Sequence, residues 1–444
     1  MTDQPAAPTA APISAVADRP LKDHPLRVAL TNEVHARPPE ALAAPMRATL
    51  LAMLSGEGAG ELERRYLERL CEWAGVPKPA RGATHYSGSF GSFRLKWERH
   101  TEFSTYTIYR PGSFAEPFAD PALDSLPRDW LAGLPGELMV GIHVALLERG
   151  TAEPDGGQLI GVFGSDSYVG GHIAGGAATA WTDYRIHGDG FSRVLIHDRS
   201  LGIRQAGRFV QRLLEIETYR VMALMALPMA REVLPRIGTI ETDLATLTAR
   251  SAALRTLDDE RDMLDRLTRL SAQAEQIAAE TAYRFGAARA YYEIVDRRIG
   301  ELREVRIEGL QTISEFMERR LAPAIRTCEA VQARLDSLSQ RLARASNLLR
   351  TRVEIAVEGQ NAELLQSMDR RAQLQLRLQE TVEGLSVVAI SYYLIGIVGY
   401  AAKSMKGFGW KVDSDMVTGL MIPVVLAFVW TGVRRIRKAI AGRH

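Results

Sequence analysis

The hydrophobic pattern of the chain changes twice, and each change predicts a different kind of structure. From Pro20 to about Ala80 the apolar spacing is helical. Pro45 can open one helix, whose apolar stripe would comprise Met46, Leu50, Leu51, Met53 and Leu54. A second helix is predicted at residues 61–73, and the sequence Gly-Val-Pro-Lys-Pro from Gly75 ends it.

Between Gly82 and His197 the hydrophobic period becomes two, which is typical of β-strands. Phe93, Leu95 and Trp97 alternate with the polar residues Arg94, Lys96 and Glu98, and a return strand is predicted at 103–109. Further strands are predicted at residues 138–147, 159–163, 178–186 and 191–196. The pattern therefore indicates an α/β domain with a sheet of five or six strands.

After Ser200 the pattern is helical for nearly all of the remaining chain. An amphipathic helix is predicted at 201–227, ending at Pro228, and another runs towards Arg250. Two heptad seams follow. The first comprises Leu264, Leu267, Ser271, Ala274, Ala278, Thr281, Phe285, Ala288, Tyr292, Val295, Ile299 and Leu302, and the second comprises Leu335, Leu338, Leu342, Ala345 and Leu349. Such long seams predict antiparallel or self-associating helices in a coiled-coil-like stalk.

The stalk is predicted to continue into the membrane. Arg306 interrupts the first seam and marks a register break, and Pro323 indicates a kink or a helix start. From about residue 324 to residue 402 the sequence contains no proline. One helix could therefore run through this whole stretch, with Gly359 and Gly384 as its weakest points.

Two uncharged apolar runs near the C-terminus predict a membrane anchor. Residues 385–402 and 416–433 each comprise 18 residues without a charge, and about 20 apolar residues, within a range of roughly 17–25, cross the hydrocarbon core. The alternative is a pair of buried core helices, but basic residues follow each run, which favours the membrane. Pro423 is compatible with a span because neighbouring helices can satisfy the carbonyl that it frees.

Basic residues on both sides of the anchor predict its orientation. The positive-inside rule places both ends of the anchor in the cytoplasm and the loop outside, because the loop carries only three lysines. The same basic residues are candidates for binding the membrane surface, where each gains about 1 kcal/mol from anionic lipid; a solvated helical face is the alternative. They are Arg370, Arg371, Arg377, Arg434, Arg435, Arg437 and Lys438.

Composition narrows the class of protein. A chain of 444 residues exceeds one compact core, and a net charge of +2 gives no reason to expect a nucleic-acid partner. Cys71 and Cys328 are the only cysteines and lie far apart, which fits a reducing compartment. The first 17 residues are rich in Ala and Pro and lack an apolar core, so they predict a disordered leader and not a signal peptide.

Together these patterns predict an α+β protein with seven segments. A disordered leader (1–19) precedes a cytoplasmic α/β domain (20–200) and a long helical stalk (201–384). Two transmembrane helices (385–402 and 416–433) follow, joined by a short periplasmic loop (403–415), and a basic cytoplasmic tail (434–444) ends the chain.

Two groups of residues are candidates for chemistry, each with a plainer alternative. Glu33 and His35 could share a face of an extended segment and bind a metal ion or orient a substrate, but no HExxH, CxxC or DxD motif accompanies them, which favours a structural role. The second group could form a transition-metal site, although its spacing matches no compact ligand motif. It comprises His143, His172, His187 and His197 with Asp166, Asp183, Asp189 and Asp198.

A glycine-rich stretch and three polar residues of the anchor complete the candidates. Residues 170–176 lack the GxxxxGK[ST] and GxGxxG patterns of phosphate-binding loops, so a turn between strands is predicted there. Ser386, Ser391 and Tyr400 are the polar groups of the first apolar run that could line a pore. At about 100° per residue they do not share one helix face.

Several stretches of the sequence resemble one bacterial family. They are residues 24–39 (HPLRVALTNEVHARPP), 95–106 (LKWERHTEFSTY), 348–353 (LLRTRV) and 374–393 (LQLRLQETVEGLSVVAISYY). The family consists of uncharacterised membrane-anchored proteins and is domain of unknown function family 3422. The resemblance extends from about residue 20 to residue 403 and implies a protein of the bacterial inner membrane, with no established activity.

The overall plan is also similar to that of CorA-type magnesium channels, which combine a cytoplasmic α/β domain, stalk helices, two C-terminal spans and a basic tail. The end of the first apolar run reads Gly399-Tyr-Ala-Ala402 where those channels carry Gly-Met-Asn, so magnesium transport does not carry over. We predict a non-enzymatic, oligomeric scaffold or sensor without a cofactor. A divergent CorA-like ion channel and a membrane-tethered metal-dependent hydrolase remain as alternatives.

Overall fold

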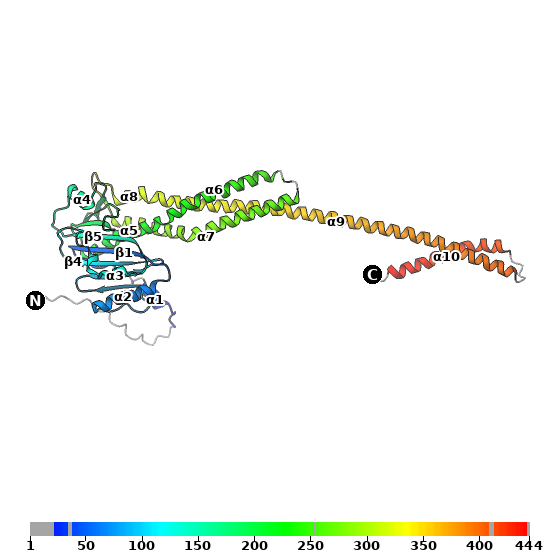
Figure 1. Ribbon diagram of the computed structural model, residues 1–444, viewed down its shortest axis with the longest axis horizontal. Helices are drawn as coiled ribbons and strands as arrows, with labels where there is room; N and C mark the ends of the chain where they lie inside the picture. Colours follow the sequence, from blue (N-terminus) through cyan, green and yellow to red (C-terminus); the bar gives the residue numbers. More distant parts are fainter. Residues whose placement is uncertain (1–21, 34–37, 253, 255, 408–412, 442–444) are drawn as a thin grey trace. The chain divides into compact units, whose positions relative to one another are not determined.

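The computed structural model describes residues 22–33, 38–252, 254, 256–407 and 413–441. The predicted leader at 1–19 lies outside these residues. The chain divides into two compact units, residues 1–246 with 269–342, and residues 247–268 with 343–444. The first unit contains the sheet, whereas the second contains the apolar C-terminal helices (Figure 1).

A mixed sheet of nine strands forms the base of the first unit, in the order β2-β3-β4-β1-β5-β8-β7-β6-β9 within the described residues. Among the described strands, only β5 and β8 pair in parallel. The strands are β1 (Met46–Leu54), β2 (His85–Ser89), β3 (Arg94–Arg99), β4 (Phe103–Pro111), β5 (Glu137–Leu147), β6 (Val169–Ile173), β7 (Ala178–Thr182), β8 (Ser192–Asp198) and β9 (Val305–Arg306). The prediction of five or six strands was therefore too low, because it missed the short strands β2, β6 and β9 and assigned β1 to a helix.

Strand β1 corrects the helix predicted after Pro45. It pairs with β4 on one side and with β5 on the other, and eight of its nine residues are buried. A strand buried on both faces is apolar at nearly every position, so its sequence lacks the alternation that identifies a half-buried strand. The spacing of Met46, Leu50 and Leu54 that suggested a helical stripe is a consequence of this continuous burial.

Helix α4 (Gly156–Phe163) corrects the strand predicted at residues 159–163. Asp155 accepts a hydrogen bond from the backbone N–H of Gln158, and the Gln158 side chain accepts one from the backbone N–H of Asp155. This capping box satisfies two N–H groups at the helix start. Leu159 and Phe163, four residues apart, then lie on the same buried helix face.

Different helices pack against the two faces of the sheet. On one face, α2 (Gly60–Ala74), a 3₁₀ turn (Ala122–Ser125) and α3 (Arg128–Ala132) cover a core that includes Leu95, Trp97, Tyr106 and Ile108. The helix predicted at 61–73 is thus confirmed as α2, with Gly75 as its left-handed C-cap at φ 66°. The opposite face lies against α5 (Ile203–Leu224) and α7 (Leu257–Leu302) (Figure 1).

Helix α5 passes very close to the segment that leads into β1. A Cβ atom at Gly207 would overlap the carbonyl oxygen of Glu40, and the N–H of Leu42 donates to the carbonyl of Ile203 across 3.0 Å. Only glycine permits this approach between a helix and a neighbouring backbone.

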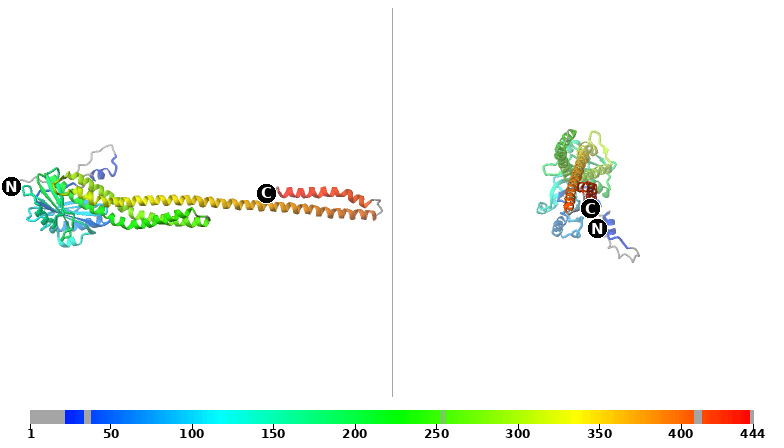
Figure 2. Two further views of the ribbon diagram at one scale, coloured as in Figure 1. Left: turned by 90° about the horizontal axis from the view of Figure 1, so that it is seen from above. Right: turned by 90° about the vertical axis from the view of Figure 1, so that its right-hand side faces the viewer.

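Within the first unit, parts of three helices lie side by side: α6 (Ala226–Ser251), α7 and α9 (Ala322–Gly407). Their packing can be followed in Figures 1 and 2. Ion pairs join each pair of helices: Arg236 with Glu280, Arg334 with Glu241, and Arg289 with Glu329. The predicted seam residues face this bundle and are buried or half-buried. Those that are buried in this unit are Ala274, Thr281, Phe285, Ala288, Val295, Leu302, Leu335, Leu338 and Leu342.

The predicted register break and helix start are also present. α7 ends at Leu302, Arg306 lies in β9, and α8 (Ile313–Arg320) precedes α9, which begins at Ala322 beside Pro323. α9 comprises 86 residues without interruption, so it is about 130 Å long. Gly359 and Gly384 do not break it.

The second unit contains α9 from residue 343 onwards and the final helix α10 (Ser414–Ala441), together with residues 247–268. Two helical segments in this part of the chain are long and apolar enough to cross a membrane. They correspond to the predicted runs at 385–402 and 416–433. The molecule is therefore α+β, with an N-terminal sheet domain, one long C-terminal helix and a final apolar helix.

Candidate functional site

Each of the candidate histidines of the sheet domain has a hydrogen-bond or ion-pair partner of its own. His143 Nδ1 lies 2.8 Å from the Thr49 hydroxyl, His172 Nδ1 lies 3.0 Å from the Thr179 hydroxyl, and His197 Nε2 lies 3.0 Å from the Thr151 carbonyl. His187 pairs with Asp183 across 3.1 Å. Within the described part of the chain, no group of three or more His, Cys, Asp or Glu side chains could hold a metal ion.

The carboxylates named with these histidines do not converge either. Asp198 accepts a hydrogen bond from the backbone N–H of Leu201 at 2.7 Å, and Asp189 pairs with Arg193 at 3.3 Å. Asp166 is exposed. In the glycine-rich stretch at 170–176, residues 170–173 belong to β6, and only residues 174–176 lie in the predicted turn into β7.

The remaining predicted site residues lie outside the described chain or on exposed helices. His35 and the side chains of Glu33, Arg437 and Lys438 are not among the described groups. Arg370, Arg371 and Arg377 are exposed on α9, and Arg434 and Arg435 are exposed on α10. The Arg434 guanidinium lies 4.9 Å from the centre of the Trp430 ring, a cation–π contact.

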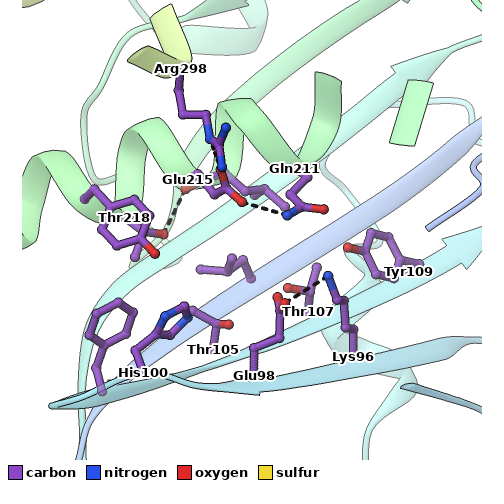
Figure 3. A pocket seen from close by; sticks show the side chains of 14 residues that line it. Lys96, Glu98, His100, Thr105, Thr107, Tyr109, Gln211, Glu215, Thr218 and Arg298 are labelled. Carbon is purple, nitrogen blue, oxygen red and sulfur yellow. Dashed lines mark hydrogen bonds and ion pairs between the residues drawn. The ribbon is translucent and has the colours of Figure 1, made fainter. Parts of the chain in front are cut away.

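A cavity of about 270 Å³ lies between the second face of the sheet and helices α5 and α7 (Figure 3). Strands β1, β3 and β4 form its floor, where Lys96 lies opposite Thr107 and Glu98 lies opposite Thr105 in the strand pairing. Because side chains alternate between sheet faces, residues at every second position of β3 and β4 reach this space. The full lining is Leu50, Lys96, Glu98, His100, Phe103, Thr105, Thr107, Tyr109, Gln211, Leu214, Glu215, Thr218, Tyr219 and Arg298.

The floor carries an acid–base pair that is largely removed from solvent. Lys96 Nζ lies 3.0 Å from Glu98 Oε1, and the two side chains are 5% and 13% exposed. An ion pair this deep is costly to desolvate and is stabilised only when further polar groups surround it. Thr105 and Thr107, which lie opposite the pair on β4, bring two hydroxyl groups to the same cavity.

A second acid–base pair lies on the opposite wall. Glu215 of α5 pairs with Arg298 of α7, and the Gln211 amide donates to Glu215 at 2.7 Å. Arg298 also pairs with Glu301 at 2.9 Å, and Glu301 in turn pairs with Arg212 at 2.9 Å. This network joins α5 to α7 above the sheet and fixes the position of the wall (Figure 3).

One end of the cavity is aromatic. The His100 ring stacks on Phe103 with 4.3 Å between centroids, and Tyr219 meets both rings edge-on. Next to these rings, Tyr291 stacks on Tyr219, and its hydroxyl donates a hydrogen bond of 2.8 Å to the buried Glu102 carboxylate. Burial and the Glu102 hydrogen bond raise the pKa of Tyr291, so its hydroxyl stays protonated.

Tyr109 lies at the other end, with its hydroxyl directed into the cavity (Figure 3). Burial, followed by the negative charges of Glu98 and Glu40, raises the pKa of Tyr109 above its ordinary range. The phenol is therefore neutral at physiological pH and is able to donate a hydrogen bond.

Sequence reasoning missed this cavity. The alternation of Arg94, Lys96 and Glu98 with apolar residues matched a strand with one polar face, and such a face is usually solvated. The signal that could have found it is the amphipathic helix at 201–227, which needs a partner for its apolar stripe and covers that same face. The stretch at 95–106 that resembles the family supplies five lining residues: Lys96, Glu98, His100, Phe103 and Thr105.

Comparison with known proteins gives one result. No curated protein and no solved structure matches the chain, and similarity to CorA-type channels is not found. One family, described as a protein of unknown function (DUF3422), matches residues 22–440, which is nearly the full length. The chain therefore belongs to the DUF3422 family.

Proposed function

We propose that the chain is a membrane-anchored, non-enzymatic sensor or scaffold whose sheet domain lies in the cytoplasm. The observation that carries the proposal is the continuity of α9, which belongs to the helical bundle of the first unit at its start and carries the apolar run at 385–402 near its end. The same helix therefore contains residues of the sheet-domain unit and residues of the proposed anchor.

The apolar runs have the exposure expected of an anchor. Val388 and Ile397 of α9 are 67% and 62% exposed, and Leu420 and Phe428 of α10 are 75% and 74% exposed. Soluble proteins rarely expose so large a continuous apolar surface. Core helices would be mostly covered, whereas only 11% of each run is buried, and this favours lipid as the solvent.

The two apolar helices also pack in the way that membrane helices do. Gly399 of α9 approaches Thr418 of α10 closely enough that a Cβ atom there would lie 3.5 Å from its hydroxyl. Ser391, Ala402, Val425 and Val429 are buried. Small residues at such contacts let helix backbones approach within a bilayer.

Self-association is the second part of the proposal. Every residue of α9 from 358 to 379 is exposed, and this stretch is about 33 Å long. Isolated helices gain most of their stability from packing, and the stretch carries Leu364, Leu365, Met368, Leu374 and Leu378. A second copy anchored in the same membrane would supply the partner at high effective concentration.

The two alternatives receive less support. A pore lined by the first span would need its polar groups on one face, but Ser391 is buried and Tyr400 is 76% exposed. A metal-dependent hydrolase would need the sheet histidines to converge, but each bonds to a separate partner.

Membrane fractionation of the full chain tests the anchor. The protein should stay in the membrane pellet after an alkaline carbonate wash and be released by detergent. Release of the unaltered chain by carbonate would refute the anchor.

A variant pair makes this test specific. The variant Val388→Asp/Ile397→Asp/Leu420→Asp/Phe428→Asp should become soluble, because each carboxylate costs roughly 2.5–3.5 kcal/mol at the centre of a span. The matched control Leu364→Asp/Leu365→Asp/Leu374→Asp/Leu378→Asp makes four changes at equally exposed residues of α9 outside the span, and should fractionate like the unaltered chain.

A further inference from the structure

The polar cavity of the sheet domain has a charge pattern that indicates its ligand. Its lining contains two cationic groups, Lys96 and Arg298, and two carboxylates, Glu98 and Glu215. The fixed charges therefore cancel. A ligand with a single net charge would give the cavity one uncompensated charge in a partly desolvated space, which is unfavourable.

The charges are also arranged as two separate pairs on opposite walls (Figure 3). The floor pair comes from β3, and the wall pair comes from α5 and α7. A molecule between them meets a cation and a carboxylate on each side. A ligand that carries both charges can satisfy one member of each pair, because charge-assisted hydrogen bonds are the strongest polar contacts available.

We infer that this cavity binds a small zwitterion with one carboxylate and one ammonium group, of the class of free aliphatic α-amino acids. Lys96 and the Thr107 and Tyr109 hydroxyls form a cluster of donors for the ligand carboxylate. Glu215 and Glu98 accept from its ammonium group. The aromatic end at His100, Phe103 and Tyr219 receives the apolar side chain.

The size of the cavity limits the ligand. Each water molecule occupies about 30 Å³ in the liquid, so 270 Å³ corresponds to about nine waters. A ligand of about nine non-hydrogen atoms fits within this space. Leucine, with that number of atoms and an aliphatic side chain, is a suitable probe.

Calorimetry with the full chain purified in detergent tests the inference. L-leucine is titrated beside two analogues that each lack one charge: 4-methylpentanoate, without the ammonium group, and 3-methylbutylamine, without the carboxylate. Leucine should bind, and each analogue should bind at least about tenfold more weakly, since a hydrogen bond to a charged group contributes about 1.5–3 kcal/mol. No binding of leucine, or equal binding of an analogue or of uncharged glycerol, would overturn the inference.

Variants connect the binding to the cavity. Lys96→Met/Glu98→Gln removes the floor pair without leaving a lone buried charge, and should weaken leucine binding at least tenfold. Thr107→Val removes one hydroxyl at nearly constant volume, and should weaken binding about fivefold. The control Lys78→Met/Glu72→Gln removes an exposed ion pair of 2.6 Å outside the cavity, and should bind leucine unchanged.

The outcome for the floor-pair variant is decisive in both directions. If the floor-pair variant has an unchanged near-ultraviolet circular dichroism spectrum, and is therefore folded, but binds leucine like the control, the proposed site is wrong. If it does not fold, Thr107→Val alone decides, and unchanged binding by that variant likewise contradicts the site. The inference goes beyond the proposed anchor and does not depend on it. Fractionation tests only the anchor and calorimetry tests only the ligand site, so a negative result in one leaves the other unaffected.

Discussion

His143 offers a pH-dependent test of how the sheet domain is packed. It lies buried on β5, with its Nδ1 atom 2.8 Å from the Thr49 hydroxyl and its ring stacked on Phe191 at 4.1 Å. Burial lowers the pKa of His143 from 6.5 to about 4. The folded state therefore favours the neutral ring.

The sign of the effect follows from the lowered pKa. Above pH 6.5 the ring is neutral in both the folded and the unfolded chain, so it makes no pH-dependent contribution. As the pH falls from 6.5 to 4, the unfolded chain gains a proton that the folded chain does not bind. The free energy of unfolding then decreases by about 1.4 kcal/mol per pH unit, which amounts to about 3 kcal/mol across the interval.

Denaturant unfolding of the full chain in detergent measures this loss, with the fluorescence of Trp97, Trp130 and Trp181 reporting on the sheet domain. The variant His143→Gln lacks the titrating ring and should lose about 3 kcal/mol less than the unaltered chain between pH 6.5 and pH 4. Carboxylates titrate in both proteins, so only the difference is informative. His24→Gln, at an exposed histidine, should behave like the unaltered chain. Parallel pH curves for the unaltered chain and His143→Gln would refute the reasoning.

Three further experiments test the packing of the helices and the role of the basic residues. Gly207→Ala should lower the free energy of unfolding by about 2 kcal/mol or more, because its methyl group overlaps a backbone carbonyl. The control Gly286→Ala adds a methyl group in open space on α7 and should raise the free energy of unfolding by up to about 1 kcal/mol. Equal effects of the two substitutions would contradict the close approach at Gly207. Leu342→Asp should cost several kcal/mol in thermal or denaturant unfolding because it buries a charge in the bundle, and an unchanged midpoint would mean that this face is exposed. Arg370→Gln/Arg371→Gln/Arg377→Gln should reduce the anionic lipid that copurifies with the protein, measured by lipid mass spectrometry, because each arginine contributes about 1 kcal/mol near the bilayer. Equal retention would assign these residues to a solvated face.

Long periodic segments were predictable because their burial is one-sided. The seam at Leu335, Leu338 and Leu342 faces a bundle while its neighbours face water, so the period of the helix is visible in the sequence. The proline-free stretch after Pro323 likewise identified the single long helix α9. In both cases local sequence and tertiary environment impose the same pattern.

Short apolar segments were not predictable in this way. Residues of β1 are buried on both faces, and those of α4 form a run of only eight. Periodicity cannot separate a buried strand from a helix over such a length. The capping pair Asp155 and Gln158 was the available signal for α4, whereas β1 depends on pairing with β4 and β5, which are distant in sequence.

The cavity depends entirely on tertiary contacts. Lys96 and Glu98 are two residues apart, but Glu215 and Arg298 come from helices far along the chain. The sequence contains no short motif that unites them. Charged residues on a predicted strand are ordinarily solvated, and only the packing of α5 against that face turns them into cavity walls.

Reporter fusions at three positions test the central claim, that the chain crosses the membrane twice with the sheet domain in the cytoplasm. A reporter active only in the periplasm is placed after His444, near Gly82, or within residues 408–412. The account predicts activity at 408–412 alone. Activity after His444 or near Gly82, or silence at all three positions together with release from membranes by carbonate, would contradict it.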